Sequence, residues 1–132
     1  MAERNPVQTT LPVDLETLAA SAVRREGVIW TLEAVADLNA NLVRFGAGRG
    51  VGEHANDEVD VIFVGVSGVG FVEVDGREHA LDAGKLVFVP KGARRSTRGA
   101  SEDFAYLTVH GRRGPLWIGT NQSQSRQEGG KG

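Results

Sequence analysis

Short apolar segments separated by turn residues fill most of the chain, and they restrict its fold more than any other feature. The segments are rich in β-branched and aromatic residues, and Gly, Asn, Asp or Pro lies between neighbours. They comprise residues 27–33, 41–45, 59–66, 70–74, 85–89 and 104–110. The pair Asp75-Gly76, with strand-like residues on both sides, also predicts a β-hairpin. Many short strands with glycine-rich turns predict an all-β fold, either a sandwich or a barrel.

One helix is expected before the strands. Apolar residues recur at helical spacing from Leu15 to Val23, Asp14 is a favourable N-cap, and Gly27 follows as a stop. The sequence therefore predicts a short N-terminal α-helix over residues 14–26.

The length of 132 residues favours one domain with a single core. Residues 1–12 are polar with two prolines, which is typical of a flexible lead-in. Residues 119–132 contain almost no apolar side chain and are expected to form a disordered tail. The barrel itself is expected over residues 28–118.

The composition excludes several classes of function. The chain has no cysteine, which rules out disulfides, thiolate metal sites and cysteine nucleophiles. Its net charge of −2 gives no reason to expect a nucleic-acid or membrane partner. The first residues lack the apolar core of a signal peptide, and no apolar run approaches the ~18 residues of a membrane span. A cytoplasmic protein is therefore expected.

The segment at residues 59–66 is apolar on both alternating faces. Val61 and Phe63 lie on one face, and Ile62 and Val64 lie on the other. Such a strand is covered on both sides, by the barrel interior and by a second sheet or another subunit. We therefore expect a homodimer.

Residues 84–99 carry a spaced set of glycines and a proline. Gly84, Pro90 and Gly92 match the second cupin motif, G-x5-P-x-G-x2-H-x3-N, with Arg95 at the histidine position and Gly99 at the asparagine position. The chain therefore resembles the cupins in this segment.

Residues 48–68 resemble the first cupin motif, G-x5-H-x-H-x(3,4)-E-x6-G. Gly48, His54 and Gly68 match it, whereas Asn56 and Val61 replace the second histidine and the glutamate. The resemblance implies a single-domain cupin, a small jelly-roll barrel, over about residues 28–118.

The resemblance also implies where a metal would bind, but most of those ligands are replaced. His54 alone remains; an asparagine carbonyl is a poor ligand for a transition metal, valine has no donor atom, and an arginine has no lone pair. No conventional metal centre is expected. The alternative is a metal-dependent enzyme of the dioxygenase or isomerase type, with His54, Glu58 and His110 as unconventional ligands.

Arg95 suggests a different use for the barrel. In the cupin register it points inward, whereas Arg94 points outward by strand alternation. A guanidinium at the mouth of an apolar barrel suits bidentate binding of a carboxylate or phosphate. The sequence thus predicts a small anionic or polar ligand held by Arg95 and oriented by His54 and Asn56. In the competing interpretation, the basic run is a solvated rim that pairs with nearby acids, namely Glu53, Asp57 and Glu58.

Further lining residues are expected on residues 104–110. Tyr106 and His110 share one face of this strand, which is either exposed to solvent or the lining of a polar pocket. Phe63 joins them as a candidate for the pocket wall. A third alternative is a scaffold whose barrel is filled by side chains and whose outer face binds a partner. The sequence identifies no ligand and leaves open whether a reaction is catalysed.

Overall fold

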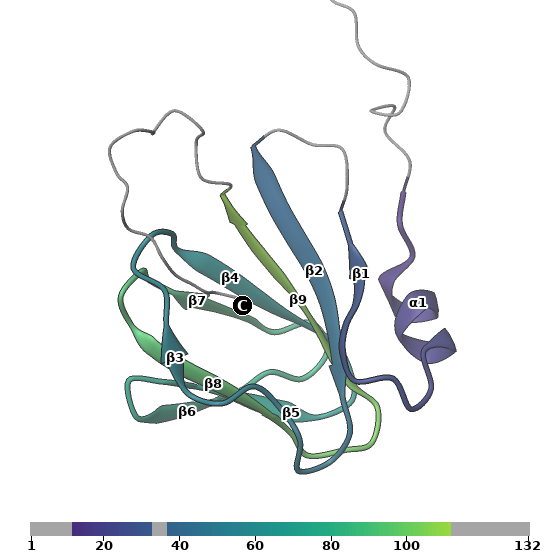
Figure 1. Ribbon diagram of the computed structural model, residues 1–132. Helices are drawn as coiled ribbons and strands as arrows, with labels where there is room; N and C mark the ends of the chain where they lie inside the picture. Colours follow the sequence, from purple (N-terminus) through teal and green to yellow (C-terminus); the bar gives the residue numbers. More distant parts are fainter. Residues whose placement is uncertain (1–11, 33–36, 112–132) are drawn as a thin grey trace, which may run out of the picture.

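The protein folds as two antiparallel β-sheets that face each other, with one helix on the outside (Figure 1). The computed structural model describes residues 12–32 and 37–111. The larger sheet has the order β1-β2-β9-β4-β7 and the smaller sheet the order β3-β8-β5-β6. The elements are α1 (Leu15–Ser21), β1 (Gly27–Thr31), β2 (Leu38–Phe45), β3 (His54–Ala55), β4 (Val61–Ser67), β5 (Gly70–Val74), β6 (Arg77–Ala80), β7 (Leu86–Val89), β8 (Arg94–Gly99) and β9 (Phe104–Gly111). The predicted all-β jelly roll with a short N-terminal helix is confirmed.

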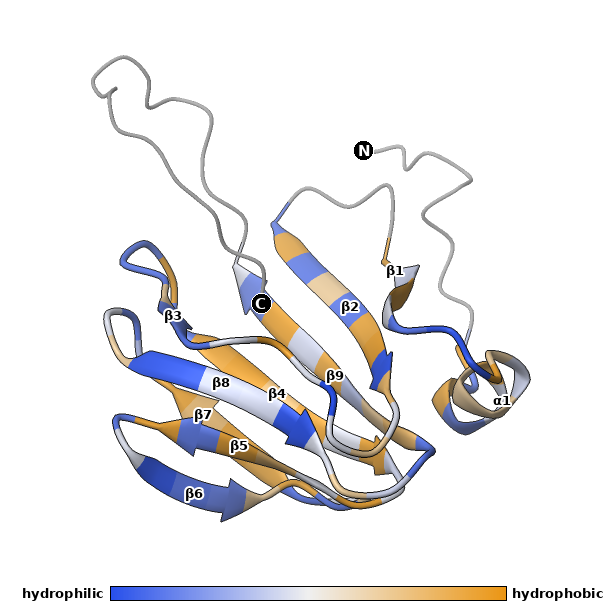
Figure 2. Ribbon diagram, turned by 60° about the horizontal axis from the view of Figure 1, so that its bottom comes forward, coloured by the Kyte–Doolittle hydropathy of each residue, from blue (hydrophilic) through white to orange (hydrophobic). Residues whose placement is uncertain are grey.

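Three strands of the smaller sheet, β3, β6 and β8, lack the apolar pattern of the others. β3 has only two residues, and β8 has the sequence RRSTRG, in which polar side chains predominate. Figure 2 shows this contrast, because apolar colouring concentrates on β4, β7 and β9, whereas β6 and β8 are largely hydrophilic. The predicted hairpin is present: Asp75 and Gly76 both have positive φ and join β5 to β6.

Helix α1 is shorter than the predicted range 14–26. Its start is as expected, since the Asp14 carboxylate accepts a hydrogen bond from the Thr17 amide at 3.1 Å. Hydrogen bonds from this turn lower the pKa of Asp14. The helix ends at Ser21 because Ala22 leaves the helical region and Arg24 adopts φ 70°. Within the described residues, no helix has the length and apolar character needed to cross a membrane.

The main core lies between the two sheets. Its buried members are Val43, Phe45, Val61, Phe63, Val72, Leu81, Val89, Ala93, Phe104 and Tyr106. A second cluster lies on the outer face of the larger sheet, where Ala19 of α1 packs on Leu42, Val66 and Ala105. The expected lead-in (1–12), except residue 12, and the expected tail lie outside the described residues, as do residues 112–118 of the predicted barrel.

The outer face of β4 is covered only in part. Val66 is buried in the second cluster, but Ile62 is 36 % exposed, and Leu86 and Phe88 on the neighbouring β7 are 60 % and 54 % exposed. Strand β4 is therefore covered on its inner face, and on its outer face only beside the helix.

Close packing of β4 against the loop before β7 gives a direct test of the fold. A Cβ atom at Gly65 would collide with the backbone oxygens of Leu81 and Asp82, whereas a Cβ at Gly52 would meet nothing within 4 Å. We expect Gly65→Ala to lower the free energy of unfolding by about 3 kcal/mol, as overpacking in a core does. Gly52→Ala should change it by less than about 0.5 kcal/mol. Urea denaturation measures both, and equal effects would contradict this packing.

Candidate functional site

Strand β8 carries Arg95 into the interior. The exposure of its residues alternates, so Arg95 is 1 % exposed and Thr97 is 5 % exposed, whereas Arg94 is exposed to solvent. The turn before the strand is anchored at both of its central residues. The Lys91 amide donates to the Asp60 carboxylate at 2.8 Å, and the Gly92 amide donates to the Asn56 carbonyl at 2.8 Å.

One nitrogen of the Arg95 guanidinium donates a hydrogen bond within the described residues, and the other two nitrogens do not. Its Nε donates to the Ala93 carbonyl at 3.3 Å. Nη1 and Nη2 are buried and have no hydrogen-bond partner among the described residues. Burial lowers the pKa of Arg95, because removal from water disfavours the charged form. A buried donor left unsatisfied costs about 1–3 kcal/mol, and a charged one costs more. The two Nη atoms are therefore an energetic cost in this structure.

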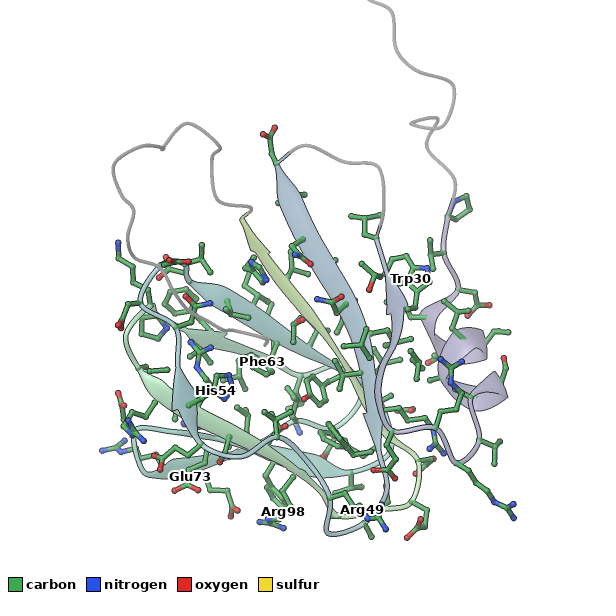
Figure 3. All side chains as sticks on the ribbon, viewed as in Figure 1. Trp30, Arg49, His54, Phe63, Glu73 and Arg98 are labelled. Atoms are coloured by element: carbon green, nitrogen blue, oxygen red, sulfur yellow. The ribbon has the colours of Figure 1, made fainter. Side chains whose placement is uncertain are left out.

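His54 lies directly opposite Arg95 in the register of β3 and β8. Its Nδ1 is 3.0 Å from the Gly52 carbonyl oxygen. A carbonyl oxygen can only accept, so Nδ1 carries the proton and Nε2 of the neutral ring carries a lone pair. Nε2 is buried without a partner in the part of the chain that the structure describes. Figure 3 shows the His54 and Phe63 side chains in the space between the two sheets.

A layer of aromatic side chains lies on one side of Arg95 along the barrel. The Tyr106 hydroxyl lies 2.9 Å from Thr97 Oγ1 and so joins the two sheets. The Tyr106 ring stacks on Phe63, with centroids 5.6 Å apart, and lies 5.2 Å from the Phe104 ring. Burial raises the pKa of Tyr106. This layer contains no exposed aromatic group, since Phe63, Phe104 and Tyr106 are each 0 % exposed.

Arg95 and Thr108 occupy the next layer. Gly99 pairs with Gly70, where an added Cβ would touch the Phe104 ring, so the end of β8 and the start of β9 lie together. Moving two residues away from that end leads from Thr97 to Arg95 on one sheet and from Tyr106 to Thr108 on the other. Each step is about 6.6 Å at ~3.3 Å per residue. Arg95 and Thr108 therefore face the same level of the interior.

Polar side chains continue from Thr108 toward the rim, which we define as the end of the barrel that holds Asn39 and His110. Asn41 pairs with Thr108 and Asn39 pairs with His110 across β2 and β9, so the four share the inner face. At this end β2 and β9 extend beyond the smaller sheet (Figure 1). Thr108 Oγ1 is buried and has no partner among the described residues.

We call His54, Arg95, Asn39, Asn41, Thr108 and His110 the inner polar layer. Its two asparagines are tied to their neighbours: Thr31 Oγ1 donates to Asn41 Oδ1 at 2.7 Å, and Asn41 Nδ2 donates to Asn39 Oδ1 at 3.1 Å. The sequence analysis missed both asparagines. Their spacing of two residues inside an otherwise apolar strand is the pattern that identifies them, because asparagine is depleted in strands without such a role.

Asn56 and the remaining arginines have other roles. The Asn56 side-chain oxygen accepts from the Glu58 amide at 2.8 Å, which is a local turn and occupies that oxygen. Arg94 pairs with Glu53 at 3.1 Å, and Arg98 pairs with Glu78 at 2.6 Å, both on the surface. The basic run therefore divides. Arg94 and Arg98 are exposed and pair with acids, whereas Arg95 is buried.

The donor set does not fit a transition metal. Residues 12–32 and 37–111 contain no group of three or more His, Asp or Glu side chains that could hold an ion, and His54, Glu58 and His110 all fall within this range. A guanidinium lies opposite His54 and has no lone pair to donate. Its positive charge would also repel a cation at this point.

A depression lies along the edge strand β1. It is open, has a volume of about 560 Å³ and is lined by residues 28–31. Its only hydroxyl among these residues, that of Thr31, already donates to Asn41. This depression therefore has fewer polar groups that could bind a ligand than the inner polar layer has.

Known structures with this architecture are numerous, and those named below are distant in sequence. KdgF from a Halomonas species is 21 % identical, with 67 % of this chain and 81 % of that chain covered and a TM-score of 0.60. TT1209 from Thermus thermophilus is 23 % identical, with 78 % and 98 % covered and a TM-score of 0.65. A cupin-2 domain containing protein from Shewanella frigidimarina is 20 % identical, with 67 % and 81 % covered and a TM-score of 0.53. At these identities the likeness shows the fold alone.

Sequence comparison gives the family. No curated protein sequence matches the chain. The family model described as "Cupin domain" matches residues 41–110, which is more than half of the chain and contains the inner polar layer except Asn39. Together with the two facing antiparallel sheets, this match shows that the chain belongs to the cupin family.

Proposed function

We propose that this cupin binds a small organic anion inside its barrel and that Arg95 holds the anionic group. The observation that carries the proposal is the guanidinium at 1 % exposure, whose Nη1 and Nη2 have no hydrogen-bond partner among the described residues. Folding places this charge inside at a cost. A ligand that supplies two acceptor oxygens removes that cost and gains charge-assisted hydrogen bonds.

The Arg95 geometry defines which edge of the guanidinium meets the ligand. Nε is occupied by the Ala93 carbonyl, so the edge formed by Nη1 and Nη2 remains. Two parallel N–H groups on this edge match the two oxygens of a carboxylate or of a phosphate. Phe63 and Tyr106, which are buried in the barrel, are the proposed apolar wall beside them.

Access to Arg95 requires motion. Because the residue is 1 % exposed, an anion reaches the Nη atoms only after side chains at the rim move. His110 and Asn39 are half-buried there. We therefore expect association to be slower than diffusion allows, as it is when binding needs a conformational change.

The sequence-based expectation of a homodimer stays a proposal, with the second copy placed on β7. This strand is the last in the larger sheet, and its exposed Leu86 and Phe88 adjoin the exposed Ile62. Two identical edges can pair around a two-fold axis, which makes one patch serve both copies.

Replacing Arg95 tests whether this side chain binds a ligand or stabilises the fold. We expect Arg95→Met to stabilise the ligand-free protein by about 1–3 kcal/mol, because an apolar side chain replaces a buried charge that lacks hydrogen bonds. The same change should abolish the stabilisation that acetate, propionate or phosphate gives the wild type. Urea denaturation with and without each anion measures both effects.

Arg94→Met is the matched control for this experiment. Its side chain is exposed and paired with Glu53, so its loss should cost less than about 1 kcal/mol and leave anion binding intact. Strong destabilisation by Arg95→Met, with unchanged anion binding, would contradict the proposal. An intact wild type that binds none of the anions would instead favour the scaffold alternative.

Metal content tests the enzyme alternative. We expect untagged protein, purified without chelator, to hold far less than one transition-metal ion per chain by elemental mass spectrometry. The same result is expected after incubation with Fe, Mn, Ni and Zn, because a guanidinium stands where the family places a histidine. A near-stoichiometric metal would refute this and direct attention to His54, Glu58 and His110.

A charge introduced into the exposed apolar patch on β4 and β7 tests the proposed dimer. We expect Phe88→Glu to convert a dimer into a monomer in sedimentation analysis, since it places a charge in the apolar contact. Val23→Glu is the control, because Val23 is also exposed, at 63 %, but lies beside the helix. A wild type that is monomeric at all concentrations would overturn the proposed dimer.

A further inference from the structure

We infer that the anion is a short hydroxycarboxylate, whose carboxylate binds Arg95 and whose hydroxyl donates to His54 Nε2. This inference rests on the anion site proposed above and adds the second polar group of the ligand. It comes from three side chains of the inner polar layer that each have a buried polar atom without a partner within residues 12–32 and 37–111, namely His54 at Nε2, Arg95 at Nη1 and Nη2, and Thr108 at Oγ1.

His54 requires a donor. Its Nδ1 proton is used by the Gly52 carbonyl, so the neutral ring offers only an acceptor at Nε2. A hydroxyl satisfies Nε2, whereas a carbonyl oxygen would place two lone pairs against each other. A ligand with a keto group at this point is therefore disfavoured, although its size is the same.

The register places the hydroxyl next to the carboxylate. His54 and Arg95 are directly opposite on β3 and β8, with Cβ atoms about 4.5–5.5 Å apart in such a pair. Thr108 approaches the same level from the facing sheet and can donate to or accept from a ligand oxygen. A ligand that contacts all three side chains must carry its polar groups close together. A short acid with a hydroxyl near its carboxylate meets this requirement.

Charge excludes an amino acid as the preferred ligand. An ammonium group would also donate to His54 Nε2, but it would place a second cation beside Arg95. The inner polar layer contains no carboxylate, and none of the acids that pair with arginines among the described residues, Glu26, Glu53 and Glu78, belongs to it. A hydroxyl supplies the same hydrogen bond without a charge.

Four three-carbon acids of nearly equal size test this inference. Calorimetric titration of the full chain compares propionate, lactate as separate enantiomers, pyruvate and L-alanine. We expect the better lactate enantiomer to bind about five- to tenfold more tightly than propionate, which corresponds to one net hydrogen bond. Pyruvate and L-alanine should bind no better than propionate. The two enantiomers should differ, because with the carboxylate and the hydroxyl held in place, their methyl group and hydrogen exchange positions against the wall of the barrel.

Two substitutions assign the preference to His54 and Thr108. His54→Phe should make lactate and propionate equal while propionate binding persists, and Thr108→Val should weaken lactate more than propionate. Thr108→Val keeps the shape of the side chain and removes only its hydroxyl. Equal affinities of lactate and propionate for the wild type, or a lactate preference that survives His54→Phe, would overturn the inference.

The outcomes separate this inference from the anion site itself. If propionate and lactate bind equally and both depend on Arg95, the anion site stands and the hydroxycarboxylate inference fails. If neither acid binds, both fail. If the variants do not fold, ¹⁵N spectroscopy of the three histidines in the wild type decides, since lactate should shift the His54 Nε2 resonance and propionate should not. No lactate-specific shift would overturn the inference.

Discussion

The Tyr106 side chain joins the two sheets, and the layout of the interior follows from it. Its hydroxyl meets Thr97 on the smaller sheet at 2.9 Å, and its ring stacks on Phe63 of the larger sheet. This contact fixes the position of β8 relative to β9 along the barrel. Because side chains on one face of a strand recur every two residues, the next level toward the rim holds Arg95 and Thr108. The level of Arg95, where we propose the ligand site, is thus set by a hydrogen bond and an aromatic contact beside it.

The interior changes character at this level. Around the Thr97–Tyr106 contact, Phe104 and Tyr106 are 0 % exposed, whereas from the level of Thr108 to the rim β2 and β9 present Asn41, Asn39 and His110 beside the apolar Val61 of β4. A fully apolar barrel of this size would be more stable than one with a charge at its centre. The terminal nitrogens of the buried Arg95 lack partners among the described residues. This charge lowers the stability of the fold, so the residue chosen here conflicts with the stability of its surroundings. Such conflicts in folded proteins concentrate at functional sites, which is the physical ground for assigning a ligand here.

Much of the fold was predictable because its causes are local. Alternating apolar residues and the Asp75-Gly76 turn indicate strands and hairpins regardless of what packs on them. The helix start was predictable from the Asp14 cap, but its end was not, since Arg24 enters a left-handed conformation that no residue preference announces. β3 and β8 were missed because their side chains are polar, and their pairing with each other and with β5 defines them as strands.

The sequence by itself determined the family, the inward position of Arg95 and the arginine at the histidine position of the second motif, because each depends on residue identity at a fixed spacing. Only the tertiary structure decided which of the neighbouring arginine side chains form ion pairs with acidic side chains and which one does not. Arg94 and Arg98 reach Glu53 and Glu78, which are far from them in sequence. It also brought Thr108 level with Arg95 and turned His54 so that Gly52 takes its Nδ1 proton. Contacts between strands distant in the chain set these relations, and no local pattern contains them.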